Sequence, residues 1–201
     1  SPSIWLGSED ASLTFPRYVV SLNFDQIKAA AVDFISATVS HYAGRIQWWN
    51  LMQEPNLQND LGFTPAQMLD FTQAVLTAGR KADPKAVMAV LLTSPGLELG
   101  YMTEPPGNEA PINFIPTYDY LRQMLDAGVR PDAVGVQFYY GARYPSIDLG
   151  TVSDLLDVYA QDFDVPIYIE ELEYPTHEEY PGLVNMSTPW TWHQGHTDQA
   201  L

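Results

Sequence analysis

Four short apolar segments alternate along this chain with segments whose apolar residues recur at helical spacing. The clearest of them, Ala86–Leu92, contains no polar residue, as expected for a parallel strand buried on both faces. The other three fall near residues 46–53, 133–138 and 165–169. Because strands that alternate with helices pair in parallel, the sequence predicts an α/β fold.

The segments between the strands carry helix-start signals. Asn23 or Ser21 can cap a first helix, and Thr64 followed by Pro65 can cap a second. Two more helices are expected over 118–127 and 151–163. The long loops all follow strands, and loops at the carboxyl ends of strands are typical of the active-site face of a (β/α)8 barrel.

At 201 residues, the chain is expected to form one domain over residues 1–201. A complete (β/α)8 barrel usually needs about 250 residues, and four strands are about half of one. The sequence therefore predicts either a part of a larger barrel or an open sheet. If the chain were complete, its unpaired sheet edges would favour self-association.

Composition excludes several classes of function. The formal net charge of −16 would repel phosphate backbones, so nucleic-acid binding is not expected. No apolar run approaches a membrane span of about 20 residues, no signal peptide is visible, and cysteine is absent. The four histidines show no metal-ligand spacing, so neither a metal nor a cofactor is expected. Twelve Tyr and five Trp could supply stacking surfaces for sugars.

Two glutamates end predicted strands that are far apart in the chain. Glu54 follows the strand near 46–53, and Glu171 follows the strand at 165–169. Retaining glycosidases pair one carboxylate as acid/base with a second as nucleophile. Spacing alone leaves open that both are solvated residues near the start of the next helix.

Five motifs surround these glutamates in a recognisable order. They are Ser40–Ile46 with Trp49-Asn50, Gln53-Glu54-Pro55, Ala82–Ala86, Pro131–Gln137 and Ile169–Glu173. Together they make nearly all of the chain resemble the family-10 glycoside hydrolases, endo-β-1,4-xylanases of the clan of (β/α)8 retaining glycosidases. The resemblance implies strands 4 to 7 of a TIM barrel, with the chain beginning after strand 3 and ending before strand 8.

The resemblance also implies roles for the two glutamates. Glu54 would be the acid/base and Glu171 the nucleophile, in a secreted, extracellular enzyme that needs no cofactor. Its partner would be a plant cell-wall polysaccharide, with endo-acting hydrolysis of β-1,4-xylan by double displacement as the first expectation.

Further site residues are expected around the pair. Gln53 stands where the family has Asn, which moves its amide by one methylene, and Gln137 can position substrate. Tyr139 stands in place of a His beside the nucleophile and can donate to it. Trp190 and Trp192 can form the floor of a sugar-binding subsite, or they can instead pack a loop against the rim of the barrel.

Glu170 replaces the family's Thr and adds a like charge beside Glu171. It is expected to be a surface charge or to lie behind the site. Two alternative functions stay open: a glycosidase-derived barrel that binds glycan or is structural without hydrolysing it, and a related enzyme of the clan with another glycan substrate.

Overall fold

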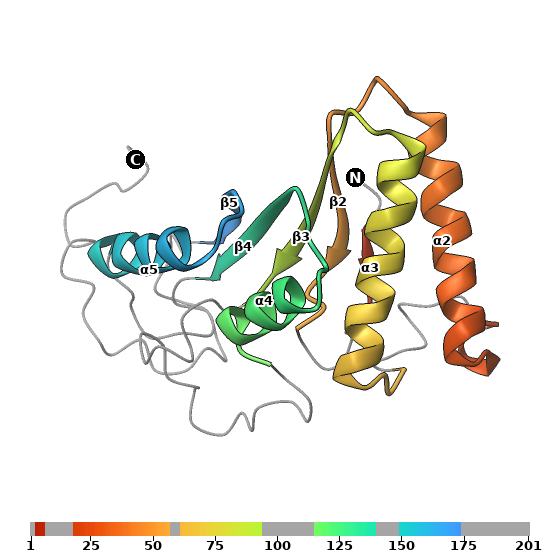
Figure 1. The fold of residues 1–201 in the computed structure, drawn as a ribbon, viewed down its shortest axis with the longest axis horizontal. Helices are drawn as coiled ribbons and strands as arrows, with labels where there is room; N and C mark the ends of the chain where they lie inside the picture. Colours follow the sequence, from red (N-terminus) through yellow and green to blue (C-terminus); the bar gives the residue numbers. More distant parts are fainter. Residues whose placement is uncertain (1–2, 7–17, 57–60, 94–114, 140–148, 174–201) are drawn as a thin grey trace, which may run out of the picture.

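The computed structural model describes residues 3–6, 18–56, 61–93, 115–139 and 149–173 (Figure 1). The predicted tryptophans Trp190 and Trp192 lie outside these residues. Five parallel strands form one sheet in the order in which they occur in the chain. They are β1 (Ile4–Trp5), β2 (Trp48–Gln53), β3 (Val87–Leu92), β4 (Ala133–Tyr139) and β5 (Ile167–Glu173).

Four α-helices connect these strands and lie along one side of the sheet (Figure 1). They are α2 (Phe24–His41), α3 (Pro65–Ala82), α4 (Thr117–Asp126) and α5 (Leu149–Asp162), and a 3-10 turn, Val19–Ser21, precedes α2. Parallel crossovers are almost always right-handed, so strands paired in chain order place every connecting helix on the same face. A singly wound sheet of this kind is the arrangement of a barrel rather than of a doubly wound sheet.

The four predicted strands and four predicted helices are confirmed, and the sequence missed one strand. Ile4 pairs with Met52 and Trp5 with Gln53, so β1 extends the sheet beyond β2. The expectation that the chain begins after the strand preceding β2 is therefore wrong. The strand β1 has only two residues, and it lies between polar and glycine-containing stretches. So short a segment shows no periodicity from which a strand could be predicted.

The helix starts follow from their caps. The Asn23 side chain accepts from the backbone N–H of Gln26, and the Gln26 side chain accepts from that of Asn23. Thr64 and Gln67 form the same reciprocal capping box before α3. Each box satisfies two N–H groups that have no partner within the helix. Of the two predicted caps for α2, the structure therefore selects Asn23.

The main core lies between the sheet and the helices. Trp49 is fully buried there. Gly79 of α3 allows close approach, because a Cβ atom at this position would lie 2.5 Å from Leu51 Cδ1 and 2.8 Å from Met88 Sδ. Leu51 and Met88 therefore mark the helix-covered face of the sheet. None of the described helices is long and apolar enough to cross a membrane.

Candidate active site

Glu54 lies directly after β2 with an unusual backbone conformation. Its φ angle is 52°, in the left-handed region, and among the described residues it is the one non-glycine residue with a positive φ. Its backbone N–H donates to Leu91 O at 2.7 Å, so the residue is still tied to β3. Such conformations are costly for residues with a Cβ atom and cluster at functional sites.

Glu171 lies in the carboxyl-terminal half of β5 beside Gln137 of β4. The Gln137 side-chain amide donates to Glu171 Oε2 across 3.1 Å, and Gln137 is only 1% exposed. The structure thus brings together two of the predicted site residues. The amide fixes the position of one carboxyl oxygen of Glu171.

Both strands that carry the candidate glutamates contain a register shift. In β2, Asn50 pairs with Ala89 and Met52 with Val90, which leaves Leu51 as an extra residue. In β5, Ile169 pairs with Val136 and Glu171 with Gln137, which leaves Glu170 as an extra residue. Bulges are rare in parallel sheets, and they re-aim side chains next to active sites.

The bulge in β5 decides where Glu171 points. Successive side chains of a regular strand alternate between the two faces, so Tyr168 and Glu170 would share one face and Glu171 would take the other. The extra residue shifts this alternation by one. Glu171 consequently points to the same face as Gln137, away from the helices, and we call this the inner face.

Glu170 also points to the inner face. Its Oε1 accepts from the Trp48 indole N–H at 3.0 Å, and Trp48 packs edge-on against Tyr168 with ring centroids 4.8 Å apart. A Cβ atom on Gly135 would lie 2.5 Å from Glu170 Cδ, so the glutamate carboxyl occupies the space over Gly135. Of the two expectations for Glu170, a surface charge or a position behind the site, the structure favours the second, because Glu170 is partly buried and joins β5 to β2.

Burial raises the pKa of the Glu170 carboxyl above its ordinary value. The hydrogen bond from Trp48 acts in the opposite direction, and the neighbouring charge of Glu171 raises the pKa further. Glu170 is therefore an easier residue to protonate than an exposed glutamate.

A buried clamp that the sequence analysis missed holds the loop after Glu54. Asn56 is 1% exposed, and its amide donates to the carbonyls of Thr93 and Ile115 and to the Thr117 hydroxyl, at 3.1, 3.3 and 3.3 Å. Its Oδ1 accepts from the Thr93 N–H at 3.3 Å. One side chain thus joins the segments that follow β2 and β3 to the start of α4. An asparagine three residues after a strand is a weak signal, because its partners come from distant segments.

The remaining predicted site residues are placed as follows. The Gln53 carbonyl oxygen Oε1 accepts from the Ser3 hydroxyl at 3.2 Å, so its amide is oriented from the side of β1. Tyr139 is the last residue of β4 and pairs with Glu173 in the register. Its expected contact with Glu171 stays a prediction.

The sheet order sets a condition on the two glutamates. Strands β3 and β4 lie between β2 and β5, so three spacings of about 4.8 Å, or about 14 Å in all, separate their backbones along the sheet. The Glu54 and Glu171 carboxyls can approach to the ~5–5.5 Å of a retaining pair only if the sheet curves around the inner face. Closure into a barrel provides that curvature.

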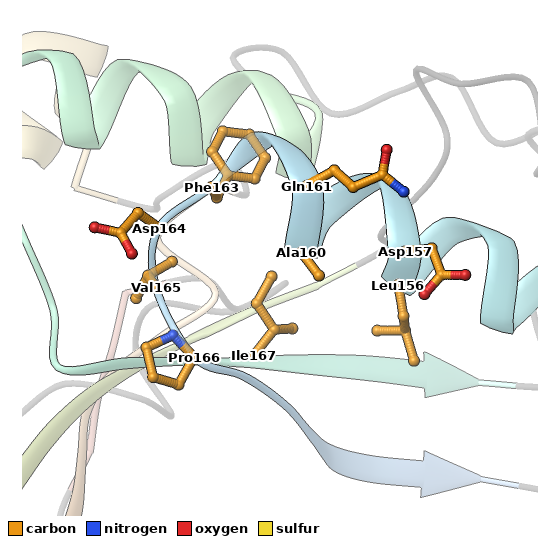
Figure 2. Close-up of a pocket in the computed structure, with 9 residues that line it drawn as sticks. All are labelled: Leu156, Asp157, Ala160, Gln161, Phe163, Asp164, Val165, Pro166 and Ile167. Carbon is orange, nitrogen blue, oxygen red and sulfur yellow. The ribbon is translucent and has the colours of Figure 1, made fainter.

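A surface hollow of about 680 Å³ lies elsewhere. Its lining comes from the second half of α5 and the start of β5 (Figure 2): Leu156, Asp157, Ala160, Gln161, Phe163, Asp164, Val165, Pro166 and Ile167. It opens on the helix side at the amino end of β5. It is therefore distinct from the candidate site at the carboxyl ends of the strands, and none of the predicted site residues lines it.

Comparison with known proteins agrees with this arrangement. The family model for glycosyl hydrolase family 10 matches residues 11–186. No curated protein gives a significant match.

Several solved structures are similar to this chain. A GH10 protein from Paenibacillus barcinonensis is 20% identical over 80% of this chain and 47% of its own, with a TM-score of 0.56. A thermostable mutant of the xylanase Xyn10A from Cellvibrio japonicus is 16% identical over 92% and 53%, with a TM-score of 0.61. The GH53 catalytic domain of Ignisphaera aggregans is 14% identical over 83% and 43%, with a TM-score of 0.63.

At these identities the likeness establishes the fold alone. The chain spans about half the length of these structures. The predicted fold class is confirmed: the parallel sheet and its helices are part of a (β/α)8 barrel.

Proposed function

The chain belongs to glycosyl hydrolase family 10, and we propose that it supplies both catalytic carboxylates of a retaining glycoside hydrolase that cleaves β-1,4-linked xylan. The observation that carries the proposal is the bulge in β5, which turns Glu171 onto the inner face beside Gln137. The activity and the substrate of the whole protein are both part of the proposal.

In the proposed reaction, Glu171 attacks the anomeric carbon and Glu54 protonates the leaving oxygen, which forms a covalent glycosyl-enzyme. Glu54 then removes a proton from water as the water attacks this intermediate. The Gln137 amide, 3.1 Å from Glu171 Oε2, holds one carboxyl oxygen of the nucleophile in place. Gln53 and Tyr139 contact the bound sugar, and Trp190 and Trp192 supply a stacking surface.

The negative net charge of the chain is compatible with an uncharged polymer as substrate. A net charge of −16 repels polyanionic polysaccharides and nucleic acids, whereas an unsubstituted xylan carries no charge. A polymer of the plant cell wall is encountered outside the producing cell, and we therefore expect the enzyme to act extracellularly.

Replacement of each carboxylate tests the proposal. Glu171→Ala should abolish xylan hydrolysis in the protein, because no nucleophile remains. Glu54→Gln should slow cleavage of xylan by about 10²–10⁴-fold, the usual contribution of a general acid. Release of reducing sugar measures both effects.

The control removes a carboxylate that lies far from the inner face. Asp33→Ala changes an exposed residue of α2 and should leave the rate unchanged. Hydrolysis at the native rate in Glu171→Ala would contradict the proposal.

A second candidate is a barrel that binds glycan without hydrolysing it. The observation that favours it is the Gln53 amide, which replaces the family's Asn and whose oxygen is already engaged by Ser3. Xylo-oligosaccharide binding with no product after long incubation would select this candidate. A panel of mannan, glucan and arabinose-substituted xylan would identify a different substrate.

A further inference from the structure

The strongest observation not used by the proposed reaction is the contact between Trp48 and Glu170. The two residues lie 122 positions apart in the chain, on β2 and β5. Their hydrogen bond is therefore a tie between the strand that precedes Glu54 and the strand that carries Glu171. We call it the Trp48–Glu170 tie.

We propose that Glu170 is a positioning residue, which anchors the β5 bulge to Trp48 and thereby holds Glu171 against Gln137. This inference rests on the proposed function, because it assigns Glu171 as the nucleophile. Glu170 itself does not contact substrate in the proposal.

The bulge in β5 is what turns Glu171 to the inner face. Glu170 is the residue without a register partner in β4, and removal of the bulge would return Glu171 to the helix side of the sheet. A bulged residue has no partner in the pairing of the two strands, so another interaction has to hold it in position. The indole N–H of Trp48 provides that interaction at 3.0 Å.

The absence of a side chain on Gly135 leaves space for the Glu170 carboxyl. Gly135 lies beneath Glu170, and any Cβ atom there would stand 2.5–2.8 Å from the Glu170 Cδ, Cγ and Oε2 atoms. Trp48, whose indole donates to this carboxyl, packs edge-on against Tyr168 of β5. Gly135 of β4 and the Trp48 indole of β2 thus fix the place of the Glu170 carboxyl.

The anchored residue and the proposed nucleophile are neighbours in β5. Glu171 follows Glu170 directly, and its carboxyl oxygen is held by Gln137, the inner-face neighbour of Gly135 on β4. A shift of Glu170 therefore moves Glu171 relative to Gln137. Displacement of a reacting group by about 1 Å can cost about 10²-fold in rate.

The experiment measures kcat and KM on xylan for three single variants and one double variant of the full chain. Glu170→Ala and Trp48→Phe each remove the tie, and each should lower kcat about 10–100-fold with KM within about two-fold of native, because the nucleophile is misplaced while substrate contacts remain. Glu170→Gln keeps an oxygen that accepts from Trp48, and should retain kcat within about three-fold. The double variant Trp48→Phe/Glu170→Ala should be no slower than the slower single variant, because both remove one contact.

Asp154→Ala is the matched control, since it removes one carboxylate from an exposed position of α5 and should leave kcat unchanged. The proposal is overturned if Trp48→Phe has native kcat, or if Glu170→Gln is as slow as Glu170→Ala. The second result would mean that the negative charge, and not the hydrogen bond, is what the site uses.

A second measurement does not depend on hydrolysis. The side-chain amide resonance of Gln137, identified by its loss in Gln137→Leu, should move in Trp48→Phe and stay close to native in Glu170→Gln. If the native protein proves inactive, the proposed function fails, and this resonance alone decides the tie. An unmoved resonance in Trp48→Phe would overturn the inference, even if Glu170→Ala does not fold.

Discussion

The surroundings of Glu170 change the acidity of its carboxyl group. Its carboxyl is partly buried over Gly135, accepts from Trp48, and has a pKa raised first by burial and also by the charge of Glu171. An acid whose pKa is raised in the folded state binds more protons folded than unfolded between the two pKa values. The free energy of unfolding therefore falls as pH rises through that window.

The resulting prediction concerns the stability of Glu170→Gln. The variant keeps the acceptor for Trp48 and has no charge to bury. The free energy of unfolding of the variant minus that of the native protein should be lowest near pH 4. This difference should grow as pH rises from the ordinary glutamate pKa of about 4.3 to the raised pKa of Glu170, and should stay constant above it. Urea unfolding of both proteins between about pH 4 and pH 7 measures the difference, in which the titration of the other carboxylates cancels. Parallel stability curves across this range would contradict the raised pKa.

The sequence predicted Glu54, Glu171 and Gln137 as site residues because each stands at a recognisable strand end. It could not decide whether Glu170 is a surface charge or lies behind the site, since Glu-Glu-Leu-Glu has the composition of a solvated segment. The bulge that buries this residue depends on pairing with β4, 34 residues away, and leaves no periodicity in the sequence.

At the scale of the elements, Asn56 connects the ends of β2 and β3 to the start of α4. The predicted elements were confirmed because caps and apolar runs are local signals. The clamp could not be predicted, since its partners lie 37 to 61 positions away along the chain. It ties the segment after the strained Glu54 to the sheet.

Asn56→Ala should lower the free energy of unfolding by about 2–4 kcal/mol, because buried donors and acceptors lose their partners. Urea unfolding measures the loss. Gln123→Ala removes an amide from an exposed position of α4 and should change stability by no more than about 0.5 kcal/mol. An Asn56→Ala protein as stable as this control would show that the clamp contributes nothing.

At the scale of the whole molecule, the parallel sheet in chain order and its one-sided helices form part of a (β/α)8 barrel. Apolar strands alternating with capped helices predicted this architecture. The two-residue strand β1 was missed, because a strand that short is recognised only from its pairing with β2. The central claim is the proposal that, in the closed barrel, Glu54 and Glu171 act together as a retaining pair.

Covalent trapping tests this claim most directly. The protein would be incubated with an activated 2-deoxy-2-fluoro xylobioside, whose glycosyl-enzyme hydrolyses slowly, and the modified peptide would be identified by mass spectrometry. We expect one sugar adduct per chain, attached to Glu171 and absent from Glu171→Ala. An adduct on another residue, or continued xylan hydrolysis with no adduct, would contradict the account.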